Sequence, residues 1–290
     1  MIEQSPAIST RPRTRISFVR VLKGIVLCLG LLYLAAVACL YFAQRTLMYF
    51  PFRESPNVLA VRAQKEGFTS WTNTHGELMG WYRRSRLGGA NSSAVLVFHG
   101  NAGSAVDRTF LADTLQRGQH VDVYLVEYPG YGGRPGVPTE ESLFAAAREA
   151  FDAVAAKGKV YLVGESLGTG VASHLAGTCS SRVAGVFLIA PFNNFSAAAH
   201  SHYPIFPTRW ILKDRYESDV FLRRYTGPLA VILAGHDEVV PNHLGRKLFD
   251  GYAGPKKLWI NERASHNSLS ELNENTWPEV LTFFARGKGS

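Results

Sequence analysis

The sequence is poor in cysteine and contains no repeated or low-complexity stretch. Only three of its 290 residues are cysteines, and two of these, Cys28 and Cys39, fall in an apolar run near the N-terminus. So few cysteines argue against a fold held together by disulfides. The composition, 46% hydrophobic and 19% charged, fits one globular domain together with a membrane element.

Nucleotide and metal motifs are also missing. The glycines around Ser166 match neither the G-x-G-x-x-G fingerprint nor a P-loop. His200 and His202 resemble a metal-binding pair, but their alternate spacing without a third ligand is weak support for a metal site. The net charge is +8, and five basic residues precede residue 24: Arg11, Arg13, Arg15, Arg20 and Lys23. Much of the basic excess therefore has a topological explanation, and we expect no nucleic-acid partner.

An uncharged apolar run of 20 residues, 24–43, follows this basic segment. A helix of that length spans roughly 30 Å, the thickness of a bilayer hydrocarbon core. We therefore expect a basic cytoplasmic segment at 1–23, a transmembrane anchor at 24–43 and a globular domain at 44–290. Because fewer basic residues follow the run than precede it, this domain is expected on the non-cytoplasmic side, in a periplasm or lumen.

Processing of the anchor stays open at this stage. Ala36-Val37-Ala38 resembles a signal-peptide cleavage site, and Cys39 behind it suggests a lipoprotein site. Against both, the apolar run continues through Phe42, and alanine is a poor residue three before a lipidated cysteine. The favoured interpretation is an uncleaved single-pass anchor, followed by an amphipathic connector at Gln44–Pro51 on the membrane surface.

Beyond the connector, short apolar runs alternate with helical patterns. The runs predict strands at 68–72, 78–83, 94–98, 121–127, directly before Ser166, 185–190, 229–234 and 257–260. Helices are predicted to end near residue 116, to cover 140–156 with Thr139 as N-cap, to follow Ser166, and to cover 241–251 and 278–286. The alternation predicts an α/β fold with a mostly parallel central sheet and helices on both faces.

The strand before Ser166 ends in Gly164-Glu165-Ser166-Leu167-Gly168. A strand, a sharp turn and a helix in this order are typical of a nucleophile elbow, which exposes a serine hydroxyl above the sheet. Gly164 and Gly168 lack a Cβ, so strand and helix can approach closely around the turn. Because Gly-x-Ser-x-Gly also occurs in ordinary strand–helix turns, the interpretation depends on the partners of Ser166.

A serine nucleophile needs a base, and the base needs a group that orients it. In chain order these follow as an acid and then a histidine, each after a later strand. Asp237 is the first acidic residue after its strand and is the expected acid, with Glu238 as the neighbour that could replace it. His266 is the expected base. His243, the other histidine after Asp237, falls in a predicted helix and is expected to be an exposed polar residue.

An oxyanion hole needs two backbone donors aimed at the developing negative charge. The N–H of Leu167 is one candidate. The loop after the strand at 94–98 should supply the second, and Asn101 is favoured there, with Gly100 letting the backbone approach the substrate. His99 is expected to stabilise this loop rather than to take part in catalysis.

Five stretches together carry a family resemblance: Phe98–Gly103, Tyr128–Gly132, Gly164–Gly168, Gly235–Pro241 and Ser265–Asn267. They resemble the membrane-anchored α/β-hydrolase-domain serine hydrolases, which include protein depalmitoylases and serine aminopeptidase-like proteins. The similarity covers roughly residues 44–286. Pro129 stands where the group usually carries Arg, and Gly168-Thr169-Gly170 where a Gly-Gly pair is usual. The resemblance implies the α/β-hydrolase fold and hydrolysis of acyl esters or thioesters, without a metal or organic cofactor.

An aromatic-rich insertion at about 191–226 falls where α/β-hydrolases place a cap. Its aromatic content favours an apolar acyl chain, although each ring could equally pack the cap onto the core. The expected substrate-binding residues are Phe192, Phe195, Tyr203 and Phe206. We expect a small-molecule or lipid-like acyl substrate, or an acylated protein. A serine aminopeptidase-like peptidase and a non-catalytic membrane-tethered interaction protein stay open as alternatives.

Overall fold

The computed structural model describes residues 18–87, 92–156 and 158–287. Residue contacts separate the chain into two compact units, 1–43 and 44–290. Helix α1 (Phe18–Met48) supplies the described part of the first unit and the start of the second. Its most apolar 18-residue window has a mean hydropathy of 2.5, and none of that window is buried within the protein. By length and composition α1 can cross a membrane, while residues 1–17 of the predicted basic segment lie outside the described residues.

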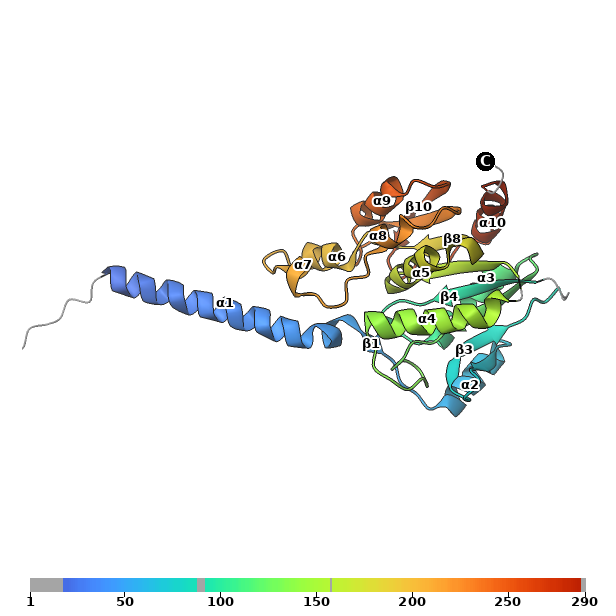
Figure 1. Ribbon diagram of the computed structural model, residues 1–290, viewed down its shortest axis with the longest axis horizontal. Helices are drawn as coiled ribbons and strands as arrows, with labels where there is room; N and C mark the ends of the chain where they lie inside the picture. The colour runs from blue at the N-terminus through green and yellow to red at the C-terminus, as the bar shows by residue number, and fades with distance from the viewer. Residues whose placement is uncertain (1–17, 88–91, 157, 288–290) are drawn as a thin grey trace, which may run out of the picture. The chain divides into compact units, whose positions relative to one another are not determined.

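The second unit is organised around an eight-stranded sheet in the order β10-β9-β8-β7-β4-β6-β3-β2. Figure 1 labels β3, β4, β8 and β10 of this sheet. The β2–β3 and β3–β6 pairs are antiparallel, and the other neighbouring pairs are parallel. The mostly parallel sheet that the sequence predicts is therefore confirmed. The strands are β2 (Thr69–Thr72), β3 (Leu78–Arg83), β4 (Ser93–Phe98), β6 (Val121–Val126), β7 (Val160–Glu165), β8 (Val183–Ile189), β9 (Leu229–His236) and β10 (Lys256–Ser265).

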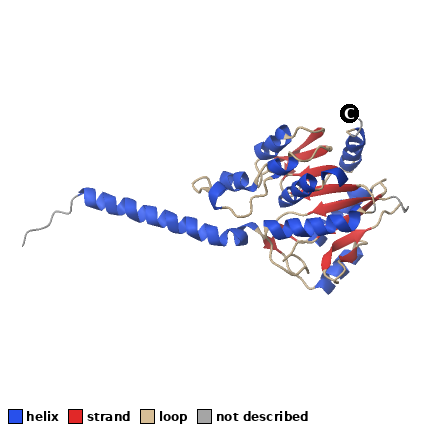
Figure 2. Cartoon of the chain, viewed as in Figure 1, coloured by secondary structure: helices blue, strands red, loops and turns tan. Residues whose placement is uncertain are grey.

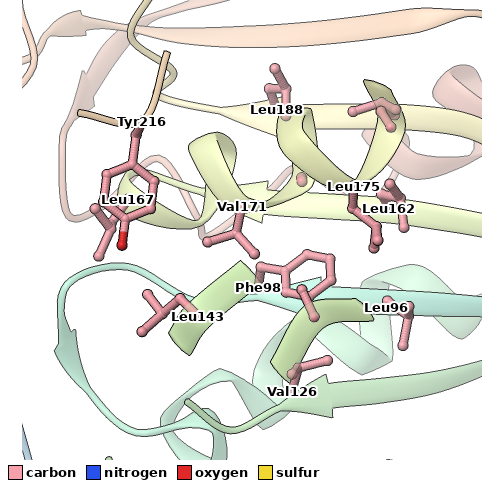
Figure 3. Close-up of a cluster of buried hydrophobic side chains, with 14 of the residues drawn as sticks. Leu96, Phe98, Val126, Leu143, Leu162, Leu167, Val171, Leu175, Leu188 and Tyr216 are labelled. Atoms are coloured by element: carbon pink, nitrogen blue, oxygen red, sulfur yellow. The ribbon is translucent and has the colours of Figure 1, made fainter. Parts of the chain in front are cut away.

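Helices cover both faces of this sheet (Figure 2). The buried strand side chains are divided between the two faces. One face carries α4 (Glu140–Ala155), α5 (Leu167–Thr178) and α9 (Asn242–Gly251); the other carries α2 (Pro56–Lys65), α3 (Thr109–Gln116) and α10 (Thr276–Arg286). Along β4, Leu96 and Phe98 pack on the first face, whereas Val95 and Val97 pack on the second. Figure 3 shows the first of these cores, where side chains of α4 and α5 meet those of the central strands. Burial on both faces explains why these strands are apolar throughout.

Capping residues fix where two of these helices begin. As predicted, Thr139 caps α4: its hydroxyl accepts the Ser142 N–H at 3.0 Å, and Ser142 Oγ accepts the Thr139 N–H at 2.9 Å. Helix α2 was not predicted, although Ser55 as N-cap and Pro56 as first residue are start signals. Short helical turns η1 (Ala105–Arg108) and η2 (Ser180–Arg182) follow the loops after β4 and α5.

The strand order reverses at β4. From β4 the chain passes to β6 on one side, and from β6 it crosses to β7 on the other side. In open α/β sheets ligands bind at the carboxyl ends of strands at such a reversal. Phe98 of β4 pairs with Gly164 of β7. The loop after β4 and the turn at Ser166 therefore start side by side.

Strand β10 is longer than predicted. The sequence predicts a strand at 257–260, whereas β10 pairs with β9 from Lys256 to Asn261 and again, after an irregularity, at Ser265. Most residues of β10 beyond Ile260 are exposed, so they carry no apolar pattern. Backbone pairing at the edge of the sheet extends the strand there, and a reading of hydrophobicity cannot detect it.

The predicted connector at Gln44–Pro51 has regular secondary structure, and its place at a membrane surface stays a prediction. Helix α1 continues to Met48, and Phe50–Pro51 forms strand β1, which pairs in parallel with β5 (Ala102–Gly103). Met48 and Tyr49 are each only 4% exposed. The segment is therefore part of the second unit. Its burial comes from contacts with residues distant in the sequence, which local sequence patterns do not report.

The insertion at 191–226 contains three short helices, α6 (Phe195–His202), α7 (Thr208–Ile211) and α8 (Ser218–Leu222). Asn194 caps α6, since its Oδ1 accepts the N–H of Ala197 at 2.8 Å. The Thr208 hydroxyl donates to the carbonyl oxygen of Ser196 at 3.0 Å and joins α7 to α6. The insertion is therefore an ordered helical element, and its role as a cap over the site stays a prediction.

Candidate active site

Ser166 lies in a strained turn between β7 and α5. Its φ of 50° and ψ of −115° fall where residues with a Cβ are rarely found. A Cβ on Gly164 would lie 2.5 Å from the carbonyl oxygen of Gly168, and a Cβ on Gly168 would collide with that of Phe98. The two glycines are therefore required for β4, β7 and α5 to pack this closely. They hold a half-buried Ser166 at the carboxyl edge of the sheet.

His266 joins Ser166 to Asp237. Its Nε2 lies 3.0 Å from Ser166 Oγ, and its Nδ1 lies 3.0 and 2.9 Å from the two carboxylate oxygens of Asp237. The Asp237 side chain is 1% exposed and also accepts the backbone N–H groups of Val239 and Val240 at 3.0 and 2.7 Å. Because a carboxylate only accepts hydrogen bonds, Asp237 favours the tautomer with the proton on Nδ1, which leaves Nε2 as an acceptor beside Ser166 Oγ.

The other acid and histidine weighed in the sequence lie elsewhere. Glu238 accepts the backbone N–H of His266 at 3.4 Å and does not bind the imidazole ring. His243 is exposed on α9, as the sequence predicts. The structure thus brings together Ser166, His266 and Asp237, which come from three loops far apart in the chain.

The loop His99–Gly103 lies against the serine turn. It is called the oxyanion loop below, after the role that the sequence predicts for it. A Cβ on Gly100 would lie 3.6 Å from Ser166 Cβ. Within the described residues, neither the N–H of Asn101 nor that of Leu167 donates to another protein group. Leu167 opens α5, where a helix leaves its first N–H groups unpaired. The two backbone donors singled out in the sequence are therefore free for an external acceptor.

Buried aromatic side chains hold the oxyanion loop. His99 is 1% exposed, its Nδ1 donates to the Gly100 carbonyl oxygen at 2.8 Å, and its ring centroid lies 4.2 Å from that of Tyr128. The Tyr128 hydroxyl donates to the carbonyl oxygen of His99 at 3.0 Å, and the Tyr131 hydroxyl to that of Asn101 at 2.7 Å. Burial raises the pKa of both tyrosines, so both hydroxyls stay protonated donors near neutral pH. These contacts agree with the loop-stabilising role expected of His99.

The structure has an ion pair beside Ser166 that the sequence did not predict. Arg108 of η1 donates through Nε to Glu165 Oε2 at 2.5 Å and through Nη2 to Oε1 at 3.3 Å. The two side chains are only 17% and 14% exposed. The pair ties the residue before Ser166 to the helical turn after the oxyanion loop. The sequence contained one indication of this pair, the acidic residue Glu165 next to the serine in a tight turn. A carboxylate that is partly buried there needs a cationic partner.

The four predicted substrate-binding residues have different surroundings. Phe192 is buried in the core and meets Phe195 edge to face, with centroids 5.7 Å apart, whereas Tyr203 is 52% exposed. Phe206 lines a pocket of about 580 Å³ between α6, α7 and α8, to which neither Ser166 nor His266 contributes. The substrate-binding role of these residues stays a prediction, and burial shows that Phe192 packs the insertion onto the core.

The two histidines that resemble a metal pair are separate from this arrangement. His200 lines the same pocket, whereas His202 Nε2 lies 2.7 Å from the carbonyl oxygen of Val239. Across residues 18–87, 92–156 and 158–287, no group of three or more His, Cys, Asp or Glu side chains is placed to hold a metal ion.

Fold and site together define an α/β hydrolase, with the strained serine turn after β7 at the reversal of a mostly parallel sheet. The sequence model of the alpha/beta hydrolase family matches residues 94–284. The chain belongs to this family, as the resemblance in the sequence implied.

Some relatives match most of this chain, and others match a smaller share of it. The uncharacterized protein Rv2307c of Mycobacterium tuberculosis is 33% identical over 266 residues, which cover 90% of this chain and 93% of that protein. The mouse lysophosphatidylserine lipase ABHD12 is 33% identical over 202 residues, covering 62% of this chain and 50% of the mouse protein. This chain therefore has hydrolase relatives that include a lipase.

Solved structures show the same fold. The esterase Est1E of Butyrivibrio proteoclasticus superposes with a TM-score of 0.59 at 15% identity, covering 76% of this chain and 99% of Est1E. The Pyrococcus furiosus esterase Pf2001 gives a TM-score of 0.57 at 15% identity, covering 83% and 98%. At this level of identity the likeness defines the fold alone.

Proposed function

We propose that this protein is a membrane-anchored serine hydrolase that cleaves acyl ester or thioester bonds through Ser166, His266 and Asp237. The observation that carries the proposal is the imidazole of His266, in hydrogen-bonding distance of both Ser166 Oγ and the Asp237 carboxylate. The chain's membership of a hydrolase family supports it.

The chemistry follows from these positions. Ser166 Oγ attacks the acyl carbonyl carbon while His266 Nε2 takes the hydroxyl proton. The imidazolium then gives this proton to the departing alcohol or thiol, and the acyl group stays on Ser166. Water attacks the acyl-enzyme in the same way and releases the carboxylic acid. Asp237 orients the imidazole and stabilises its charged form throughout.

The tetrahedral intermediates carry a negative oxygen that needs donors. The N–H groups of Leu167 and Asn101 are proposed to supply them, since both lack a partner in the described part of the chain and flank Ser166. Such preorganised donors are worth about 10²–10³-fold in kcat each. Their geometry costs no reorganisation during the reaction, because the loop and the helix start are both fixed by packing.

A lipid-like ester is the favoured substrate class. The relative ABHD12 is a lysophosphatidylserine lipase, and the insertion at residues 191–226 is rich in aromatic side chains. An amphipathic ester would also be concentrated at a membrane surface, where α1 would hold the enzyme. An acylated protein is the second substrate class, and its acyl group would be transferred to Ser166 in the same way.

Active-site labelling tests the proposal directly. A fluorophosphonate probe should label the wild-type chain and leave Ser166→Ala unlabelled. Glu238→Gln serves as matched control, because it changes a carboxylate near His266 that does not bind the ring. Equal labelling of wild type and Ser166→Ala would refute Ser166 as the nucleophile.

A substrate panel separates the alternatives. Purified full-length protein in detergent is offered p-nitrophenyl acyl esters, a lysophospholipid, an acyl thioester and an aminoacyl p-nitroanilide. Faster turnover of the esters or thioester than of the anilide, abolished by Ser166→Ala, is the expected result. Preference for the anilide would indicate an aminopeptidase-like enzyme. No turnover and no probe labelling would favour the non-catalytic interaction protein.

A further inference from the structure

The last residue of α1 and the four residues after it are hydrogen-bonded to the oxyanion loop. The Phe50 N–H donates to the carbonyl oxygen of Asn101 at 2.9 Å, and the Phe52 N–H to that of Gly103 at 3.0 Å. A third bond runs in the opposite direction: Asn101 Nδ2 of the loop donates to the carbonyl oxygen of Met48 at 3.1 Å. Met48–Phe52, called the tether strand below, therefore forms a parallel pair with this loop.

The peptide units on both sides of Asn101 are fixed by these bonds. The unit before it, which carries the Asn101 N–H, is held by His99 Nδ1 through the Gly100 carbonyl oxygen at 2.8 Å. The unit after it is held by the Phe50 N–H and by the Tyr131 hydroxyl, which both donate to the Asn101 carbonyl oxygen. A peptide unit is planar, so the orientation of the Gly100 carbonyl group sets the direction of the Asn101 N–H. The bonds to the Asn101 carbonyl oxygen fix the next peptide unit, and together the two units fix the backbone at Asn101.

The tether strand is itself held from several sides. Tyr49 is 4% exposed, and its hydroxyl lies 3.0 Å from Asp214 and 2.8 Å from the hydroxyl of Tyr216. The carbonyl oxygen of Phe52 accepts the N–H of Gly132 at 2.8 Å. A segment so extensively paired is an internal part of the second unit, and movement of its backbone would move Asn101.

We propose that the tether strand is a positioning element of the active site, which aims the Asn101 N–H at the oxyanion through the Phe50–Asn101 and Asn101–Met48 hydrogen bonds. The inference depends on the proposed serine hydrolase function. Catalytic competence then depends on a backbone segment that follows the membrane helix without a linker. Met48–Phe52 is a positioning segment and touches no substrate atom.

One pair of variants at Phe50 isolates the backbone donor. Phe50→Pro removes the N–H that binds the Asn101 carbonyl oxygen, whereas Phe50→Ala keeps it and removes only a ring that is 52% exposed. Asn101→Ala supplies a second, independent change: it deletes the side-chain bond to Met48 and keeps the Asn101 backbone N–H. All three are made in the full-length chain and assayed with the p-nitrophenyl ester that wild type turns over.

We expect Phe50→Pro and Asn101→Ala to lower kcat by about 10- to 100-fold, somewhat less than the 10²–10³-fold cost of losing a whole oxyanion donor. KM should stay within about twofold, because the oxyanion forms only after binding. Phe50→Ala should keep kcat within about twofold. A merely structural role would lower the amount of folded enzyme, seen by probe titration of active sites, and would leave kcat per active site unchanged.

The outcomes are distinguishable. Wild-type kcat per active site in folded Phe50→Pro or in Asn101→Ala would overturn the inference. If Phe50→Pro does not fold, Asn101→Ala decides alone in the same way. A wild-type chain with neither turnover nor probe labelling would instead remove the proposed function, and this inference with it.

Discussion

At the scale of single residues, the site depends on which carboxylate meets the imidazole. Asp237 binds His266 Nδ1 through both oxygens, whereas Glu238 touches only the backbone N–H of His266. Asp237→Asn should therefore lower kcat/KM by about 10³–10⁴-fold, since an amide favours the wrong imidazole tautomer. Glu238→Gln should stay within about threefold. Steady-state ester hydrolysis measures both, and a larger loss in Glu238→Gln would reverse the assignment.

A second residue-scale prediction concerns acid stability. Burial lowers the pKa of His174 from 6.5 to about 4, and its ring stacks on Phe144 with centroids 3.8 Å apart. The unfolded chain binds this proton near pH 6.5, and the folded protein does not. The contribution of neutral His174 to stability is therefore complete above pH 6.5 and is lost as the pH falls toward 4.

His174→Phe keeps an aromatic ring in this place and removes the proton site. Between pH 7 and pH 4.5 its Tm should fall less than that of wild type, as followed by circular dichroism. His174 Nδ1 is buried without a partner in the described residues, so the variant should be no less stable at pH 7. Identical losses of Tm in the two proteins over this range would contradict the prediction.

At the scale of elements, three backbones converge at Ser166. A Cβ on Gly168 would collide with the carbonyl oxygen of Phe98, the last residue of β4, and with that of His99. Gly168→Ala must therefore push α5 away from β4, which costs about 1–3 kcal/mol or more. The change also shifts the Leu167 N–H and the oxyanion loop together, so catalysis should suffer more than stability.

Ser173→Ala, on the same helix, is the matched control for this prediction. Its hydroxyl is buried and makes no hydrogen bond to the described part of the chain, so its loss should leave Tm and kcat nearly unchanged. Thermal unfolding and probe-labelling rate are measured for both variants. Gly168→Ala with wild-type labelling would show that α5 can shift without disturbing Ser166.

At the scale of the whole molecule, the question is what residues 1–43 contribute. Every contact described for the site lies in residues 44–290, which form one compact unit. A chain that begins at Gln44 should therefore keep kcat within about threefold and leave the membrane fraction, whereas the full chain should sediment with it. Ultracentrifugation followed by probe labelling measures both. Full activity loss on this deletion would mean that residues 1–43 are part of the catalytic unit.

Membrane orientation is a separate prediction at this scale. The basic residues before the apolar run favour a cytoplasmic N-terminus, which leaves the hydrolase domain on the other side. Protease added to sealed membrane vesicles of known orientation reports on which side the hydrolase domain lies. Digestion of the hydrolase domain only in vesicles whose cytoplasmic face is outside would contradict the predicted orientation.

The amino-acid sequence by itself determined the α/β fold and pointed to the central residues. Apolar runs mark β4 and β7 because both faces of these strands are buried, and glycines flank Ser166 because no Cβ fits there. The order of serine, acid and histidine, each directly after a strand, selected Ser166, Asp237 and His266, which His266 joins by hydrogen-bonding contacts. Their catalytic roles stay predictions.

Only the tertiary structure decided which distant groups complete the site. Nothing in Met48–Phe52 marks a partner for the oxyanion loop, since this segment bonds to the loop only through its own backbone N–H and carbonyl groups. The Arg108–Glu165 pair likewise joins residues 57 positions apart. Local sequence patterns report burial and turns, but pairing between remote backbones and charges is selected by the packed chain as a whole.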